Sequence, residues 1–174
     1  MMRRLARLRV PMGFLCAALA FWLARPTETS IAIGMTIALA GEALRIWAAG
    51  HIDKGREVTR SGPYRVVRHP LYLGSAVMGA GFAWAAQSLP VAILVATYLG
   101  VTLAAAMRTE EQALTAKFGD EYTAYREGRT SATLGGAGPI DRRFGWTRVV
   151  ANREYRAAAG LLIAAAFLWL RSSS

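Results

Sequence analysis

The densest group of chemically capable residues in this sequence lies at 62–72, which reads Gly-Pro-Tyr-Arg-Val-Val-Arg-His-Pro-Leu-Tyr. Pro70 has a fixed φ and no backbone N–H, which suits the first turn of a helix. Arg68, His69 and Tyr72 would then converge at a helix N-terminus, and such an end attracts anionic ligand groups. The alternative interpretation is a plain helix start with Tyr and Arg anchors at a membrane interface.

A second polar group, Glu110 and Glu111, directly follows an apolar block. Two carboxylates at a membrane edge are costly unless they are paired or solvated. The interpretations open here are a solvated helix end and a carboxylate site for a cationic ligand group. Adjacent helical residues point about 100° apart, so the two Glu cannot share one role. The positions that follow are spaced by three or four residues, which predicts one continuous helix face that carries Tyr122. This face is formed by residues 111, 114, 118, 122 and 125.

Glu42 and Arg45 form a third polar feature, inside an apolar block. Their i, i+3 spacing places them on one helix face, where they can pair. An ionisable residue inside a membrane segment is a functional candidate by default. A structural ion pair near the helix end is the equally open alternative.

Five apolar blocks must position these polar groups, at 10–24, 31–50, 71–86, 90–107 and 157–170. A spanning helix needs about 20 apolar residues, and shorter blocks can gain a turn from flanking Arg and Tyr, whose polar ends reach the interface. The last block could instead be re-entrant or interfacial. The sequence predicts an all-α, polytopic integral membrane bundle of about five transmembrane helices, with 1–174 as a single membrane domain.

The basic residues predict the orientation of this bundle. Eighteen of the 21 lysines and arginines lie in 1–9, 51–70 and 108–156. The positive-inside rule then makes the N-terminus and both polar segments cytoplasmic. The turn at 87–90 is short enough to predict an antiparallel helical hairpin. Nineteen arginines against two lysines indicate a GC-rich, bacterial source, and hence an inner-membrane protein.

Composition excludes several other classes of protein. With 54% hydrophobic and 18% charged residues, the chain has fewer charges than a soluble domain needs. Its single cysteine rules out a disulfide framework, and with only two histidines the usual zinc ligand set is missing, so no metal site is expected. The net charge of +10 could suit nucleic acid. Because these charges lie between apolar blocks, we expect a lipid bilayer as partner and no nucleic acid.

The polar groups, in this order and separated by a helical hairpin, resemble the isoprenylcysteine carboxyl methyltransferase family, part of a wider group that includes phospholipid N-methyltransferases. The resemblance covers 42–129, the methyltransferase-like core, and leaves 130–174 as a loop plus an extra apolar helix. The chain departs from the family pattern around Arg129, where the usual Pro and aromatic residue are missing. The matching motifs are Leu-Arg-x-Trp-Ala at 44–48, Ser-Gly-Pro-Tyr-Arg-x-x-Arg-His-Pro-x-Tyr-x-Gly at 61–74, and Glu-Glu-x-x-Leu-x-x-x-Phe-Gly-x-x-Tyr-x-x-Tyr at 110–125.

The resemblance implies an integral membrane methyltransferase that uses S-adenosylmethionine. It implies cofactor contacts from His69, Tyr72 and the end of the helix that carries Glu110 and Glu111. The chemistry of the side chains agrees with this. Arg68 and His69 suit the carboxylate of the cofactor, either Glu suits its ammonium, and Tyr72 or Tyr122 can pack against its adenine or sulfonium.

The resemblance also implies a lipophilic acceptor, an isoprenoid or lipid-like molecule, which carboxyl O-methylation would modify. Arg45 could orient a carboxylate or phosphate of that acceptor. If the acceptor is an amine, Glu42 could take its proton. Arg129, which stands where the family often carries an Arg, is the third catalytic candidate.

Two other functions remain open from the sequence. One is a membrane reductase of the sterol-reductase type, whose C-terminal part is similar and which uses NADPH. The other is a non-enzymatic membrane scaffold or accessory protein, which would bind no cofactor.

Overall fold

The computed structural model describes residues 2–127 and 142–173, with the backbone alone for 2–11. This part of the chain is all-helical and contains no strand, which confirms the predicted fold class. The elements are α1 (Met2–Leu23), α2 (Glu28–His51), the 3₁₀ helix η1 (Gly62–Arg65), α3 (Pro70–Ala86), α4 (Leu89–Arg126), α5 (Trp146–Ala151) and α6 (Tyr155–Ser172).

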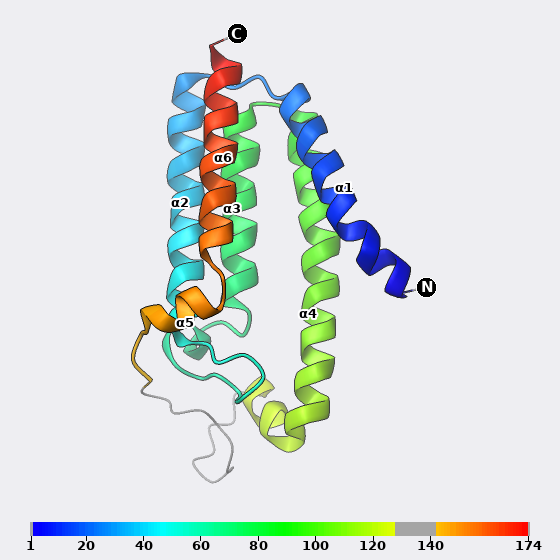
Figure 1. Cartoon of the computed structure of the whole chain (residues 1–174), viewed down its shortest axis with the longest axis vertical. Coiled ribbons are helices and arrows are strands. Elements are labelled where there is room, and N and C mark those ends of the chain that lie inside the picture. The colour runs from blue at the N-terminus through cyan, green and yellow to red at the C-terminus, as the bar shows by residue number, and fades with distance from the viewer. Residues whose placement is uncertain (1, 128–141, 174) are drawn as a thin grey trace.

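The long helices stand side by side, with the irregular segments gathered at one end (Figure 1). α2 packs extensively on α3, α6 lies against both, α4 packs on the far side of α3, and α1 leans on α4. The loop at 52–69, the bent end of α4 and α5 share the polar end of this bundle. The two polar segments therefore lie together, as the predicted topology requires, while the side of the membrane they face stays a prediction.

α2 and α4 are long and apolar enough to cross a membrane, with mean hydropathies of 1.5 and 2.0. Only 6% of the most apolar stretch of α4 is buried inside the chain. An apolar surface of that extent is stable against lipid and unfavourable in water. Of the described helices, these two are both long enough and apolar enough to span a membrane. The expected total of about five transmembrane helices stays a prediction.

Glycines allow α2 and α3 to approach closely. A Cβ atom on Gly41 would lie 2.6 Å from the carbonyl oxygen of Gly74 and 2.7 Å from the backbone nitrogen of Met78. Gly34 meets the backbone of Gly81 in the same way about two turns earlier in α2. Such close contact between small residues is how helices in lipid gain van der Waals contact.

Replacing Gly41 with Ala should therefore destabilise the bundle by about 1–3 kcal/mol, because the added methyl group meets backbone atoms that cannot rotate away. Thermal unfolding in detergent would measure this loss. Gly100→Ala in α4 is the matched control, since a Cβ there meets no atom within 4 Å. Alanine is the better helix former, so the control should be neutral or slightly stabilising. Equal melting temperatures for the two variants would contradict the packing account.

α4 is interrupted near its end at Gly119, where φ is 47° and ψ is −118°. Glycine adopts this positive φ without steric cost. The chain turns there, and residues 120–126 fold back under the bundle (Figure 1). The predicted continuous face from 111 to 125 is therefore wrong. Tyr122 and Tyr125 belong to a separate short segment, which packs against the loop that follows α2.

The segment that leads into α6 caps the end of α2. Gly50 O accepts hydrogen bonds from the backbone N–H of Gly145 at 3.0 Å and from Arg148 Nε at 2.7 Å. Asn152 Nδ2 donates to Ala49 O at 3.1 Å. The last carbonyl groups of a helix have no partner within the helix, so these bonds satisfy them. They also fix the C-terminal part of the chain at the polar end.

Candidate functional site

The start of α3 forms as the sequence predicts. Pro70 occupies the first turn, and the carbonyl of His69 accepts hydrogen bonds from the backbone N–H groups of Tyr72 and Leu73 at 3.1 and 3.0 Å. The rings of His69 and Tyr72 lie 5.6 Å apart between centroids. Arg68, just before them, is exposed. His69 and Tyr72 thus lie together at this helix end, and Arg68 directly precedes them in the chain.

His69 connects this helix end to the second polar group. Its Nε2 lies 3.1 Å from Glu111 Oε1, although the two residues are 42 positions apart. The Glu111 side chain is 35% exposed, so its other oxygen can still meet a ligand. The contact joins the two motifs that carry the family resemblance. The sequence suggested both residues as candidates but did not predict this direct contact.

Tyr122 is buried beside this contact, with 1% of its surface exposed. Its hydroxyl has no hydrogen-bond partner in the described part of the chain. Glu111, Arg68 and Glu110 all act electrostatically on it. A buried hydroxyl without a partner is costly and therefore needs an explanation. The hydrogen-bonding capacity of a ligand would supply one.

Tyr64 is a second buried tyrosine whose hydroxyl has no partner among the described residues. It lies in η1, between the end of α2 and the start of α3. Burial raises the pKa of this hydroxyl far above its usual range, and the charge of Glu110 adds to the effect, so the phenol stays neutral. The sequence assigned no definite role to Tyr64; an interface anchor was one open interpretation. The place of Tyr64 in the motif at 61–74 was the only signal for another role.

A buried ion pair holds the segment after Gly119 in place. Arg60 Nη2 and Glu121 Oε1 are 3.6 Å apart, and both side chains are less than one-tenth exposed. Tyr125 Oη also donates to the carbonyl of Tyr64 at 2.9 Å. The sequence pointed to neither Arg60 nor Glu121 as a site residue, because charged residues in polar segments are usually solvated. The pair positions Tyr122 under the start of α3.

Glu42 and Arg45 pair as predicted, with 3.7 Å between Glu42 Oε2 and Arg45 Nε. Arg45 also bonds to Glu154, the residue before α6, at 2.7 Å from its Nη2. Its Nη1 donates to Ser75 Oγ and, at 3.3 Å, to the carbonyl of Leu71 in the first turn of α3. One guanidinium thus serves two buried carboxylates. No pattern in the sequence pointed to Glu154.

These contacts place the catalytic candidates Glu42 and Arg45 next to the first turn of α3, which also carries the cofactor candidates His69 and Tyr72. Arg129 lies outside the described residues. Within 2–127 and 142–173, no three His, Cys, Asp or Glu side chains gather as metal ligands. The roles of the individual site residues stay predictions.

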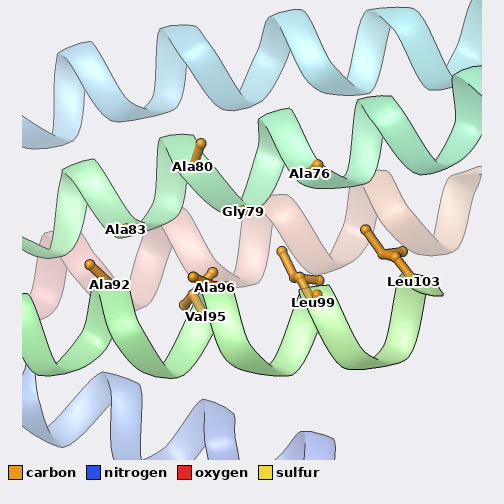
Figure 2. A pocket seen from close by; sticks show the side chains of 10 residues that line it. Ala76, Gly79, Ala80, Ala83, Ala92, Val95, Ala96, Leu99 and Leu103 are labelled. Carbon is orange, nitrogen blue, oxygen red and sulfur yellow. The ribbon is translucent and has the colours of Figure 1, made fainter. Parts of the chain in front are cut away.

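An apolar cavity of about 300 Å³ lies between α3 and α4. Figure 2 shows only alanine and glycine on the α3 side, whereas α4 adds valine and leucine side chains to its own alanines. Ala76, at one end, is a single helical turn from Tyr72. The cavity therefore approaches the polar site from the apolar part of the bundle. Its lining includes Ala76, Gly79 and Ala80 of α3 and Val95, Leu99 and Leu103 of α4.

An all-helical bundle with two lipid-compatible helices and a polar cluster at one end defines a membrane-associated protein. Residues 8–121 match the phospholipid methyltransferase family, and the chain belongs to this family. Membership indicates a membrane methyltransferase in general terms. The match ends at Glu121, so α5, α6 and Glu154, which lies between these two helices, are beyond it.

Two similar proteins carry metal-resistance names. The nickel-cobalt-cadmium resistance protein NccN of Alcaligenes xylosoxydans xylosoxydans is 30% identical over 99 residues, which are 56% of this chain and 45% of that protein. The cobalt-zinc-cadmium resistance protein CzcN of Cupriavidus metallidurans is 30% identical over 127 residues, 67% of this chain and 57% of that protein. The chain thus spans about half the length of these curated relatives. No solved structure matches it.

Proposed function

We propose that this protein is an S-adenosylmethionine-dependent methyltransferase that acts on a lipophilic, isoprenoid or lipid-like acceptor. The contact between His69 and Glu111 carries the proposal, because it joins both motifs beside the buried, unpartnered hydroxyl of Tyr122. Membership of the phospholipid methyltransferase family supports the reaction class. The isoprenylcysteine carboxyl methyltransferase type, with carboxyl O-methylation, is the more specific form of the proposal.

The side chains at this end of the bundle fit the charged groups of the cofactor. Arg68, which is exposed, would bind its carboxylate. Glu111, oriented by His69, would bind its ammonium, with Glu110 beside it. Tyr72 and Tyr122 would pack against its adenine or sulfonium. When bound, S-adenosylmethionine supplies an electrophilic methyl group.

The chain itself would contribute mainly position and orientation. Holding two reactants in line for a displacement can lower a barrier by about 7–11 kcal/mol. The cluster around Arg60 and Glu121 supports this role, because it fixes Tyr122 relative to the start of α3. The burial of Tyr122 and Tyr64 would keep water away from the reacting groups.

The acceptor would approach from the bilayer, with its apolar chain in the cavity between α3 and α4. Arg45 would orient a carboxylate or phosphate of the acceptor, and Glu42 would take the proton of an amine acceptor. Arg129 remains the third catalytic candidate. The positive-inside pattern supports a cytoplasmic site in a bacterial inner membrane. The names of the two similar proteins identify no acceptor for this chain.

The proposal is tested by supplying methyl-labelled S-adenosylmethionine to the detergent-purified protein with two acceptor probes. One probe is phosphatidylethanolamine in vesicles, which offers a primary amine. The other is a farnesylated cysteine, which offers a carboxylate on an isoprenoid chain. Label in the organic extract of either probe supports the proposal and identifies the acceptor chemistry. Label in neither extract would count against a lipophilic acceptor.

A further inference from the structure

We propose that the segment around α5 is a binding surface for the headgroups of anionic phospholipids at the edge of the bilayer. This α5 surface is formed by exposed basic and aromatic side chains, namely Arg143, Trp146, Arg153, Tyr155 and Arg156. It lies beyond residues 8–121, which match the phospholipid methyltransferase family, and the proposal does not depend on methyltransferase activity. Three observations carry it: the position of α5, the charge of the surface and the backbone of Arg153.

The position of α5 is fixed at the end of α2, one of the two helices that are able to cross a membrane. α5 lies across that end of α2 (Figure 1). Two hydrogen bonds to Gly50 O hold it there, one from the backbone N–H of Gly145 and one from Arg148 Nε. Gly50 is the second-last residue of α2. A membrane-crossing α2 therefore places α5 where the hydrocarbon of the bilayer meets water.

The exposed apolar side chains around α5 suit that depth. Trp146 is 67% exposed and Val150 is 64% exposed, and their i, i+4 spacing places both on the same face of α5. Tyr155, at the start of α6, is 56% exposed. Tryptophan and tyrosine are enriched where a membrane meets water, because each has an apolar ring and one polar group. These side chains therefore favour a lipid partner over nucleic acid.

The charge of this part of the chain has one sign. Residues 142–173 contain six arginines and one acidic residue, Glu154. Glu154 is buried and pairs with Arg45 at 2.7 Å, so it offsets no charge on the surface.

Three of these arginines are free to bind a ligand. Arg143, Arg153 and Arg156 are exposed, and their guanidinium groups have no charged or hydrogen-bonding partner among the described residues. The planar donors of a guanidinium match the oxygens of a phosphate group. Basic side chains next to a membrane surface are attracted to anionic lipids. The α5 surface therefore has the charge and the donor groups that an anionic headgroup requires.

Arg153, which joins α5 to α6, has a φ of 59°. Residues other than glycine, asparagine and aspartate seldom adopt this conformation, because the side chain crowds the backbone. No ion pair or hydrogen bond of the Arg153 side chain within the described residues offsets that cost. Backbone strain of this kind is common at positions that bind ligands. A headgroup phosphate would explain why an arginine stands here.

A bound lipid would also act on the buried network. Arg153 directly precedes Glu154, whose carboxylate holds Arg45 of α2. A headgroup on Arg153 and Arg156 would therefore fix the start of α6 against α2. Because a ligand that binds only the folded state stabilises it, an anionic lipid should raise the melting temperature of the protein.

The first test compares phosphatidylglycerol with phosphatidylcholine of the same acyl chains, each added to the full-length protein in neutral detergent. Native mass spectrometry measures an affinity for each lipid, and thermal unfolding measures the stabilisation. The wild type should bind phosphatidylglycerol at least about tenfold more tightly. That preference should shrink at high salt, which screens exposed charges. Equal affinities for the two lipids would overturn the proposal.

The second test removes charge from the α5 surface. Arg143→Gln combined with Arg156→Gln should weaken binding of phosphatidylglycerol by about 25-fold and leave phosphatidylcholine unchanged. Arg25→Gln combined with Arg171→Gln is the matched control, since it removes two exposed charges from the segment after α1 and the last turn of α6. The control should stay within about threefold of the wild type. Equal losses in both double variants would overturn the proposal, because net charge alone would then explain them.

A third variant, Arg153→Asn, separates binding from folding. Asparagine adopts a positive φ more readily, so the variant without lipid should melt at or above the wild-type temperature. Its affinity for phosphatidylglycerol should nevertheless fall by about fivefold. A lower melting temperature would show that the arginine serves the fold, and an unchanged affinity would show that it binds no headgroup. Either result would overturn the role of Arg153.

Discussion

Glu111→Gln should weaken binding of S-adenosylmethionine by at least about 100-fold, or about 2.7 kcal/mol. The substitution keeps the size of the side chain but removes the carboxylate that would meet the ammonium of the cofactor. Hydrogen bonds between charged groups are about twice as strong as neutral ones. The variant also loses the charged partner of His69, whose Nε2 lies 3.1 Å from Glu111 Oε1. Calorimetric titration of the purified protein measures the change.

Two further variants make this result specific to the site. His69→Ala should lose affinity in the same direction, because it removes the group that orients Glu111. Asp120→Asn is the matched control: Asp120 is an exposed carboxylate just after the break in α4 at Gly119, and its loss should leave binding unchanged. Affinity within about threefold of the wild type in Glu111→Gln would contradict the assignment of the ammonium site.

Arg45→Met should destabilise the protein by about 3–5 kcal/mol, enough to prevent folding in a marginal case. Arg45 is the cation that Glu154 meets at 2.7 Å and Glu42 at 3.7 Å, and both carboxylates are buried. Methionine fills a similar volume but leaves these charges without compensation. Denaturant-induced unfolding in detergent, followed by tryptophan fluorescence, measures the loss.

Arg56→Met is the control for this prediction. Arg56 is 82% exposed and lies 3.9 Å from Asp53, so its ion pair should contribute at most about 1 kcal/mol. The double variant Arg45→Met with Glu154→Gln should recover part of the lost stability, because it removes one of the uncompensated charges. Similar losses for Arg45→Met and Arg56→Met would show that the buried network is not what holds α6 to α2.

The elements of the fold that depend on local patterns could be predicted from the sequence. Pro70 defined the start of α3, and the short turn at 87–90 predicted the antiparallel pair of α3 and α4. The pairing of Glu42 with Arg45 followed from their i, i+3 spacing. The continuous face from 111 to 125 failed, because a count of helical steps does not detect that Gly119 adopts a positive φ.

The tertiary contacts of the site could not be predicted in the same way. Glu154 is 109 residues from Arg45, and the sequence around it looks like any solvated stretch of charges. The burial of Tyr64 depends on side chains from α2 and α3 that come together only in the folded chain. His69 and Glu111 were both candidates because motifs singled them out, yet their contact became visible only in three dimensions.

The most direct test of the central claim is calorimetric titration of the wild-type protein, purified in detergent, with S-adenosylmethionine, S-adenosylhomocysteine and NADPH. The account predicts micromolar binding of the first two ligands, loss of that binding in His69→Ala, and no binding of NADPH. Binding of NADPH alone would contradict the account and favour a reductase. A well-folded sample that binds none of the three would favour a non-enzymatic membrane protein.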